Sequence, residues 1–194
     1  MIALLASFLI ATNAPAAEVV ANCRSMIPAD VELRGRVILR NRKGIVQAEH
    51  DYVLVRSNAV TRLTIDGTAY NPPADGSKAP TFGILGTDVT WSDLTLDYLE
   101  WNDFSYDENP ESETVHGQVC CVILMKAGKR AVRVWVDRKT GALMQAEELV
   151  DGEAVRRLWG TRIKKFGERW MANVLEVETL GSGHRTKITV EELK

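Results

Sequence analysis

Three histidines and three cysteines are the side chains best suited to metal binding or nucleophilic catalysis in this chain: His50, His116, His184, Cys23, Cys120 and Cys121. His116 and Cys120 lie four residues apart, a spacing that invites either a zinc site or a Cys–His nucleophile. In an extended strand, however, residues four apart are separated by about 13 Å. Zinc ligands lie within about 2.3 Å of the metal, and a nucleophile must hydrogen-bond to its base. A strand therefore excludes both forms of chemistry for this pair.

No catalytic motif stands out elsewhere in the sequence. The chain has no His-Glu-x-x-His zinc motif, no Walker loop and no dinucleotide-binding glycine pattern. Gly181-Ser182-Gly183 is too short for the Gly-x-Ser-x-Gly nucleophile elbow and is expected in a hairpin turn. The acidic residues are scattered, so no carboxylate pair can be singled out for glycoside hydrolysis. We therefore expect neither an enzyme nor a bound metal or cofactor.

The cysteines leave their pairing open. Cys120 and Cys121 are neighbours in an expected strand, so their side chains point to opposite faces and should not pair with each other. A disulfide from Cys23 to either of them would leave one free thiol. Equally, all three cysteines could be small buried apolar residues.

Five tryptophans are spread along the chain: Trp91, Trp101, Trp135, Trp159 and Trp170. A tryptophan offers a large apolar surface with one hydrogen-bond donor, which suits both a packed core and the lining of an apolar pocket. Core packing is the default interpretation for all five. Trp91 and Trp101 bracket an apolar segment, so these two are the best candidates for the rim of a cavity.

That segment, Leu85–Trp101, carries the one clear amphipathic helical pattern of the mature chain. Thr90 and Asp93 match a capping box, which would begin the helix and suit its positive end. The helical period gathers the candidate cavity or lid residues on one face: Trp91, Leu94, Tyr98, Leu99 and Trp101. A lone helix of this kind must lie on a sheet. It is either a plug that completes the core or a lid over a cavity.

Alternating apolar and polar residues predict about nine β-strands in the rest of the chain. Clear turn signals such as Asp66-Gly67 and Asp151-Gly152 separate them. The expected strands are 31–42, 45–56, 59–66, 115–126, 131–137, 142–150, 153–165, 169–180 and 184–193, with loops at 71–80 and 107–114. The predicted fold is mainly β (α+β): a curved antiparallel meander that forms an incomplete or a closed barrel, with the helix inserted between two groups of strands.

The N-terminus predicts export. Residues 2–10 are apolar, and Ala14-Pro15-Ala16 places small residues at the two positions that a signal peptidase inspects. The apolar run is too short to cross a bilayer, which takes about 20 residues. We therefore expect a cleaved signal peptide at 1–16, a single domain at 17–194 and a periplasmic location.

The composition excludes one class of partner. Hydrophobic residues make up 45% of the chain and charged residues 26%, which is ordinary for a globular protein. The formal net charge is -2 at pH 7. Nucleic-acid binding needs a basic surface, so no DNA or RNA partner is expected.

Short motifs along nearly the whole mature chain carry a family resemblance. They are the strand around Gly35, Leu-Gly-Thr-Asp at 85–88, Trp-Ser-Asp-Leu at 91–94, the hairpin segments 117–122, 132–137 and 147–152, the turn at 167–170 and Thr-Lys-Ile at 186–188. In these motifs the chain resembles the outer-membrane lipoprotein-sorting protein family, the LolA-like carriers of the bacterial periplasm.

The resemblance implies an unclosed β-barrel with a helical lid over a hydrophobic hollow that takes the acyl chains of a lipoprotein. The best-known carriers have more than one lid helix and a basic strand residue that secures the lid. Arg34, Arg36 and Arg40 lie in the corresponding region of this chain.

The first functional hypothesis is a monomeric periplasmic carrier or chaperone that binds lipoprotein or lipid acyl chains for transport toward the outer membrane. Its partners would be transient and membrane-associated, with an inner-membrane exporter as one of them. The alternative is an envelope-stress sensor or scaffold module of the same fold that binds a protein regulator. A carrier should hold and hand over its ligand, whereas a sensor should change its affinity for a protein.

Overall fold

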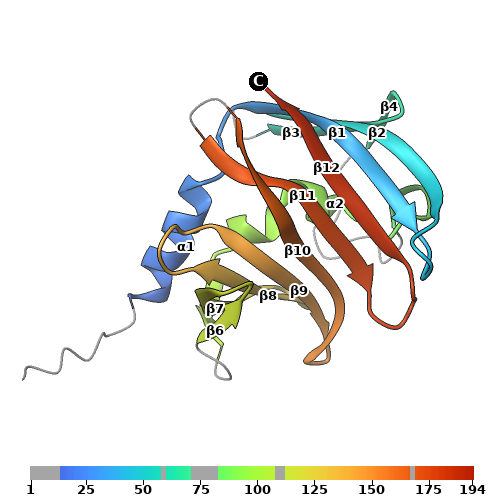
Figure 1. The fold of residues 1–194 in the computed structure, drawn as a ribbon. Coiled ribbons are helices and arrows are strands. Elements are labelled where there is room, and N and C mark those ends of the chain that lie inside the picture. The colour runs from blue at the N-terminus through green and yellow to red at the C-terminus, as the bar shows by residue number, and fades with distance from the viewer. Residues whose placement is uncertain (1–13, 58–59, 71–82, 108–111, 167–168) are drawn as a thin grey trace, which may run out of the picture.

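The computed structural model of the protein (Figure 1) describes five stretches of the chain: 14–57, 60–70, 83–107, 112–166 and 169–194. They form one antiparallel sheet of 12 strands together with two α-helices and two 3-10 turns. The predicted mainly β fold is therefore confirmed. Most of the expected signal peptide and the whole of the expected loop at 71–80 lie outside the described residues.

The helical elements are α1 (Ala16–Ser25), η1 (Ile84–Gly86), α2 (Trp91–Thr95) and η2 (Asp97–Glu100), where η marks a 3-10 turn. The strands are β1 (Val31–Arg40), β2 (Val46–Ser57), β3 (Val60–Ile65), β4 (Thr68–Tyr70), β5 (Asp103–Tyr106), β6 (Ser112–Val115), β7 (Gln118–Ala127), β8 (Arg130–Asp137), β9 (Leu143–Val150), β10 (Glu153–Phe166), β11 (Arg169–Thr179) and β12 (Arg185–Leu193).

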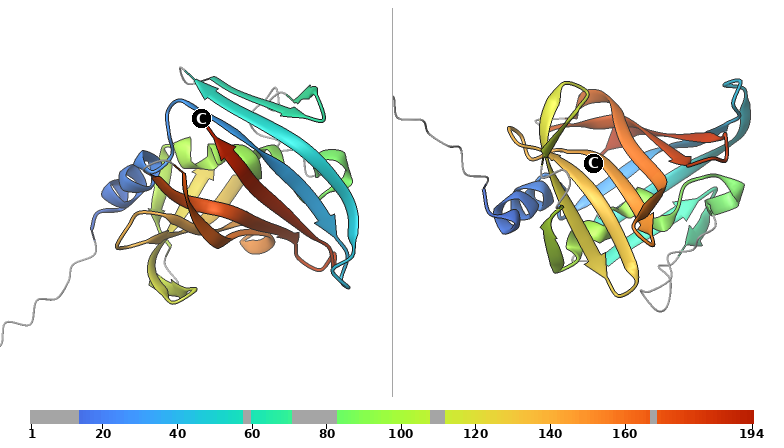
Figure 2. Two further views of the ribbon diagram at one scale, coloured as in Figure 1. Left: turned by 45° about the horizontal axis from the view of Figure 1, so that its top comes forward. Right: turned by 90° about the horizontal axis from the view of Figure 1, so that it is seen from below.

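The sheet runs in the order β4-β3-β2-β1-β12-β11-β10-β9-β8-β7-β5, with β6 also paired to β7. Sequential hairpins build two groups of strands, as the meander pattern predicts. The groups are joined by pairing of the first strand with the last, from Leu33↔Leu193 to Arg40↔Arg185. β4 and β5 are consequently the two edges, and among the described residues no pairing closes the sheet into a barrel. Figure 2 shows the strong curve of this open sheet, with the green helical elements inside it.

The nine expected strands all occur, with ends shifted by a few residues. The sequence pattern missed β4, β5 and β6, which span only three or four residues each and are too short to show an alternation. The strand expected from Val115 begins instead at Gln118, because His116 and Gly117 form a tight turn with φ of 48° and 80°. Positive φ at both central residues matches the right-handed twist of a hairpin. His116 is therefore an exposed turn residue.

A second helix, α1, contradicts the expectation of a single helix in the mature chain. It begins at Ala16, the last residue of the expected signal peptide. Val20 and Cys23 are three residues apart on one face of this helix and are each only 1% exposed. Because the buried face is narrow, this stretch has only a weak helical pattern. That pattern cannot be told apart from the apolar run at residues 2–10.

The core lies on the concave face of the sheet. Every second residue of the central strands points inward, for example Ile123 and Met125 on β7 and Val132 and Val134 on β8. A smaller apolar cluster of Val115, Cys120, Val122 and Trp135 lies on the opposite face. β7 is therefore buried on both sides, as its uninterrupted apolar sequence predicts.

The outer face carries a ladder of ion pairs across neighbouring strands. Arg133 pairs with Glu147, Arg157 with Glu147 and Glu178, and Arg185 with Glu178 and Glu176. The ladder alternates in sign from β8 to β12, so opposite charges face each other across the strands and favour this pairing.

Gly35 marks the point where β1 can approach β12 closely. A Cβ atom on this residue would lie 1.7 Å from the carbonyl oxygen of Thr189, and the β1–β12 register shifts beside it. We expect Gly35→Ala to force apart the strands that join the two halves of the sheet. The expected loss is about 3 kcal/mol in the free energy of unfolding, measured by urea denaturation.

Gly160→Ala is the matched control, because Gly160 also lies in a strand. Its Cβ would meet only the Cβ of Ala172 at 3.3 Å and Leu175 at 3.9 Å. The expected change is within about 1 kcal/mol. Equal losses in the two variants would contradict the close approach at Gly35.

Candidate functional site

The topology dictates where the helical elements lie. β4 ends at Tyr70 and β5 starts at Asp103, and these strands form opposite edges of the open sheet. The chain between them must therefore cross from one edge to the other. α2 and η2 lie inside the curve of the sheet on this path, as the views in Figure 2 show. We call residues 91–101 the crossing segment.

The crossing segment consists of two short turns, not the continuous helix that the sequence pattern predicts. The capping box forms as expected, since the Asp93 carboxylate accepts hydrogen bonds from the N–H and the hydroxyl of Thr90 at 2.7 and 2.8 Å. α2 stops after Thr95, because Leu96 adopts the left-handed conformation with φ of 54°. The chain then continues as the 3-10 turn η2.

The predicted apolar face survives this break. Leu94, Tyr98 and Leu99 are buried in the main core, as is Trp91 at the start of the segment. Trp101 is half-buried and meets the Tyr98 ring edge-on, with centroids 6.5 Å apart. The structure thus brings all five predicted residues together on the concave face. In this conformation the segment completes the core.

The space left beneath the segment is small. A cavity of about 20 Å³ lies beside Tyr98, Arg130 and Arg156. That is room for about one water molecule, whereas pockets for organic ligands enclose roughly 300–1,000 Å³. The Tyr98 hydroxyl and Arg130 Nε are buried at this cavity, and Asp97 Oδ1 is buried near by; none of the three has a hydrogen-bond partner among the described residues. Among the described residues, a long ligand can enter this cavity only if the segment moves.

Buried ion pairs attach the segment to the sheet. Arg156 of β10 points inward and forms a hydrogen-bonded ion pair with Asp93 of α2. Its Nε lies 3.4 Å from Glu148 of β9. Burial is the main influence on both carboxyl groups and raises the pKa of Asp93 and of Glu148, while the Arg156 charge opposes that shift. The arginine therefore compensates two carboxyl groups that the fold takes out of water.

Arg130 at the start of β8 makes three contacts with the same segment. It donates a 2.7 Å hydrogen bond to Ser92 Oγ and lies 3.7 Å from Asp97. Its guanidinium also stacks over the Trp101 ring at 4.8 Å from the centroid. A buried cation over an indole adds about 2 kcal/mol of attraction.

Two further arginines bind backbone carbonyl groups of the segment. Arg24 of α1 donates to the carbonyl oxygens of Leu99 and Trp101 at 2.5 and 2.7 Å. Arg56 of β2 donates to the Thr95 carbonyl at 2.6 Å. Arginines from four elements therefore secure the segment, and its described residues make no strand pairing with the sheet.

The arginines suggested by the family resemblance lie elsewhere. Arg34 pairs with Glu32, and Arg36 pairs with Glu49 and Glu191 on the outer surface. Arg40 lies at the end of β1, beside the β1–β2 turn. Among the described residues, none of the three contacts the crossing segment.

The three cysteines are free and buried. They are therefore small buried apolar residues, and none of them forms the disulfide that was the other alternative. Burial raises the pKa of the Cys23 thiol to about 12 and that of Cys120 to about 11, so both remain protonated near neutral pH. Cys120 and Cys121 point to opposite faces as predicted, since Cys121 accepts a 3.8 Å hydrogen bond from the inward-facing Tyr106 hydroxyl. No group of three potential metal ligands occurs in the described part of the chain.

Comparison with known proteins adds a family model, described as "-like: Uncharacterized protein", that matches residues 76–194. No curated protein matches the chain. The described helices include none that is long and apolar enough to cross a membrane.

Solved structures match over nearly the full length. A LolA superfamily protein from Nitrosomonas europaea has a TM-score of 0.68 at 13% identity, covering 93% of both chains. A DUF1329 family protein from Desulfovibrio piger has a TM-score of 0.65 at 15% identity, covering 93% of this chain and 92% of the other. An outer-membrane lipoprotein-sorting protein domain from Vibrio parahaemolyticus has a TM-score of 0.64 at 14% identity, covering 91% and 90%. The chain therefore belongs to the family that the matching model describes, and its open sheet with an internal helical segment is a LolA-like fold.

Proposed function

We propose that the protein is a periplasmic carrier of lipoprotein or lipid acyl chains, and that the crossing segment is its movable cover. One observation carries this proposal: the apolar side chains of the segment fill the concave face, but arginine side chains rather than strand pairing hold the segment there. Such contacts can break without unzipping the sheet. An acyl chain would then occupy the face that Leu94, Tyr98 and Leu99 vacate.

The free-energy cost of exposing the crossing segment is similar to the free energy gained by burying an acyl chain in its place. Exposing Trp91, Leu94, Tyr98 and Leu99 costs about 1.5–3 kcal/mol for each side chain, or about 6–12 kcal/mol in all. Burying an acyl chain of about 14 methylene groups returns about 11 kcal/mol, at about 0.8 kcal/mol for each group. A near balance suits a carrier, because the ligand must be released as well as bound.

The carrier needs no cofactor, and its motive step is the displacement of the segment. A monomer that receives its cargo from an inner-membrane exporter and passes it toward the outer membrane fits this scheme. The expected signal peptide at 1–16 supplies the route to the periplasm.

The filled interior supports a second candidate function, an envelope-stress sensor or scaffold module that binds a protein regulator. A cavity of about 20 Å³ is what a protein-binding module with a permanently packed core would have. In that case the crossing segment would stay in place when the partner binds.

Native mass spectrometry with lipid extraction distinguishes the two functions. Mature protein purified from the periplasm is expected to carry acyl chains near one per protein, or to take up added fatty acid or lipopeptide. A protein that is isolated empty and also refuses these ligands would rule out the carrier and favour the sensor or scaffold.

A further inference from the structure

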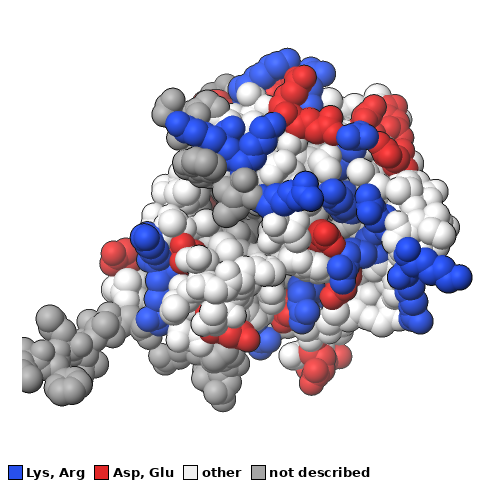
Figure 3. Space-filling model, viewed as in Figure 1, with Lys and Arg blue, Asp and Glu red and all other residues white. Residues whose placement is uncertain are grey.

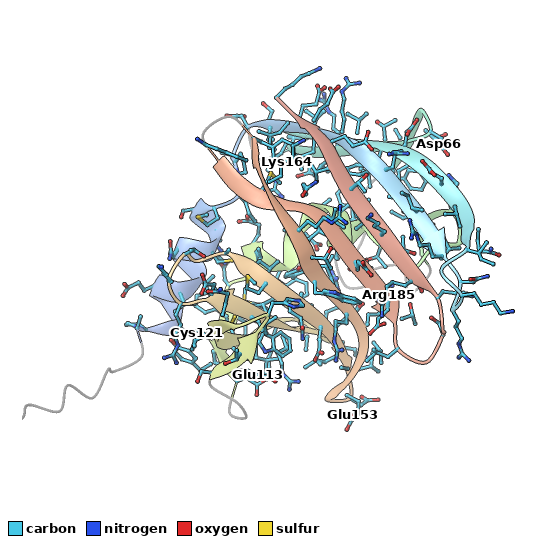
Figure 4. All side chains as sticks on the ribbon, in the orientation of Figure 1. Asp66, Glu113, Cys121, Glu153, Lys164 and Arg185 are labelled. Atoms are coloured by element: carbon cyan, nitrogen blue, oxygen red, sulfur yellow. The ribbon has the colours of Figure 1, made fainter. Side chains whose placement is uncertain are left out.

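A hollow that is separate from the crossing segment lies between two hairpin turns of the sheet. The β1–β2 turn and the β11–β12 turn come together at one corner of the molecule, beside the labelled Arg185 in Figure 4. Between them lies an open hollow of about 630 Å³. This volume is within the range of pockets for organic ligands, roughly 300–1,000 Å³. We call it the hairpin hollow.

The hairpin hollow has an excess of unpaired positive charge. Arg185 is neutralised by Glu176 and Glu178 of the outer ladder. Arg40, Arg42 and Lys187 also line the hollow. Among the described residues no carboxylate lies within ion-pair distance of any of them, although Glu176 faces Lys187 across the β11–β12 register. Figure 3 shows Lys and Arg side chains gathered over these hairpin ends. This charge attracts an anion.

The position of Arg40 destabilises the fold in two ways. It lies directly opposite Arg185 in the β1–β12 register, and like charges in that arrangement destabilise a sheet. Its Nε is buried and donates no hydrogen bond to a described residue. A buried donor without an acceptor is also unfavourable. An anionic ligand would relieve both penalties.

Arg42 is held over the hollow by the opposite hairpin. A Cβ atom at Gly183 would lie 1.8 Å from Arg42 Nε, so the guanidinium packs directly on the glycine backbone. Gly183 also has a φ of 76°, which the turn requires. The Arg42 side chain thus fills the space beside Gly183 in the β11–β12 turn.

We propose that the hairpin hollow binds a phosphate-bearing ligand, with Arg40 and Arg42 as the main hydrogen-bond donors and Lys187 as a further cation. Arginine forks match phosphate oxygens in a two-point geometry. A phosphate monoester carries about two negative charges, which suits the unpaired Arg40 and Arg42 better than a single carboxylate does. The hollow shares no residue with the crossing segment, so this site is independent of the acyl-binding proposal.

Isothermal titration calorimetry with inorganic phosphate and glycerol 3-phosphate, and sedimentation with vesicles, test the site. The vesicles contain phosphatidylcholine with or without phosphatidic acid, whose headgroup is a phosphate monoester. Binding of the soluble phosphates supports the proposal and identifies a free phosphorylated molecule as the ligand. Binding only to vesicles that contain phosphatidic acid supports it and identifies a lipid headgroup. Binding to none of these probes overturns it.

Substitutions locate the bound phosphate. Arg40→Gln and Arg42→Gln should each lower the affinity about tenfold, the effect of losing one charge-assisted hydrogen bond. Arg34→Gln is the control on the same strand, because Arg34 pairs with Glu32 away from the hollow. Equal effects of all three substitutions would mean nonspecific attraction and would overturn the site.

A glycine pair tests the placement of Arg42 without removing a charge. Gly183→Ala should weaken binding, because the new Cβ displaces the guanidinium. Gly152→Ala is the control: Gly152 also has a positive φ, 86°, but its Cβ would meet nothing within 4 Å, and it lies in the β9–β10 turn outside the hollow. If the two alanine variants bind the probe equally well, Arg42 is not the positioned donor.

Discussion

Arg156→Gln is expected to destabilise the protein by about 3–5 kcal/mol, the usual cost of removing one partner from a buried ion pair. Arg156 is 9% exposed in its side chain and faces both Asp93 and Glu148. Without the guanidinium, the Asp93 carboxyl, whose side chain is 13% exposed, and the partly buried Glu148 carboxyl lose their compensating charge. Urea denaturation followed by circular dichroism measures the loss.

Two controls make this result specific. Arg34→Gln removes an arginine of the outer surface whose side chain is 48% exposed and whose partner Glu32 is 31% exposed; its expected cost is below about 1 kcal/mol. The double variant Arg156→Gln/Asp93→Asn should regain part of the stability, because the uncompensated carboxylate is gone. Strict additivity of the two single effects would show that Arg156 and Asp93 do not act as a pair.

Leu99→Asp is expected to strengthen acyl binding while the sheet persists. Leu99 is 1% exposed in the core, and an unpaired carboxylate there costs several kcal/mol. The crossing segment should therefore leave the concave face, so that an acyl chain no longer has to displace it in order to bind. The far-ultraviolet circular dichroism should keep its β signature while binding of a hydrophobic dye rises.

Leu85→Asp is the matched control, because Leu85 precedes the segment and is 47% exposed. It should leave both dye binding and acyl binding unchanged. Complete loss of β structure in Leu99→Asp would show that the crossing segment is an integral part of the core. That result would contradict the proposal that the segment is a movable cover.

The strands were largely predictable because a buried face leaves a period of two in the sequence. The inward arginines follow the same period of two. Arg130 is in phase with Val132 and Val134, and Arg156 is in phase with Leu158, so both occupy positions of the buried face. A cation in such a position needs a buried partner, and Asp93 was already assigned to the opposing helix.

The break in the crossing segment was not predictable from its own residues. Nothing in the side chain of Leu96 favours positive φ, and a leucine there is strained. The packing of Leu94 and Tyr98 on either side against a curved sheet imposes this conformation. The β1–β12 pairing was equally unpredictable, because no local sequence pattern indicates that the first strand pairs with the last.

Hydrogen exchange of the crossing segment, with and without a bound lipopeptide, tests the movable cover most directly. The amides of Leu96, Leu99 and Trp101 are hydrogen-bonded within the segment. If an acyl chain replaces the segment, these amides should exchange faster in the complex while the β1–β12 amides keep their protection. Unchanged or slower exchange at the three amides in a complex with bound lipopeptide would contradict displacement of the segment.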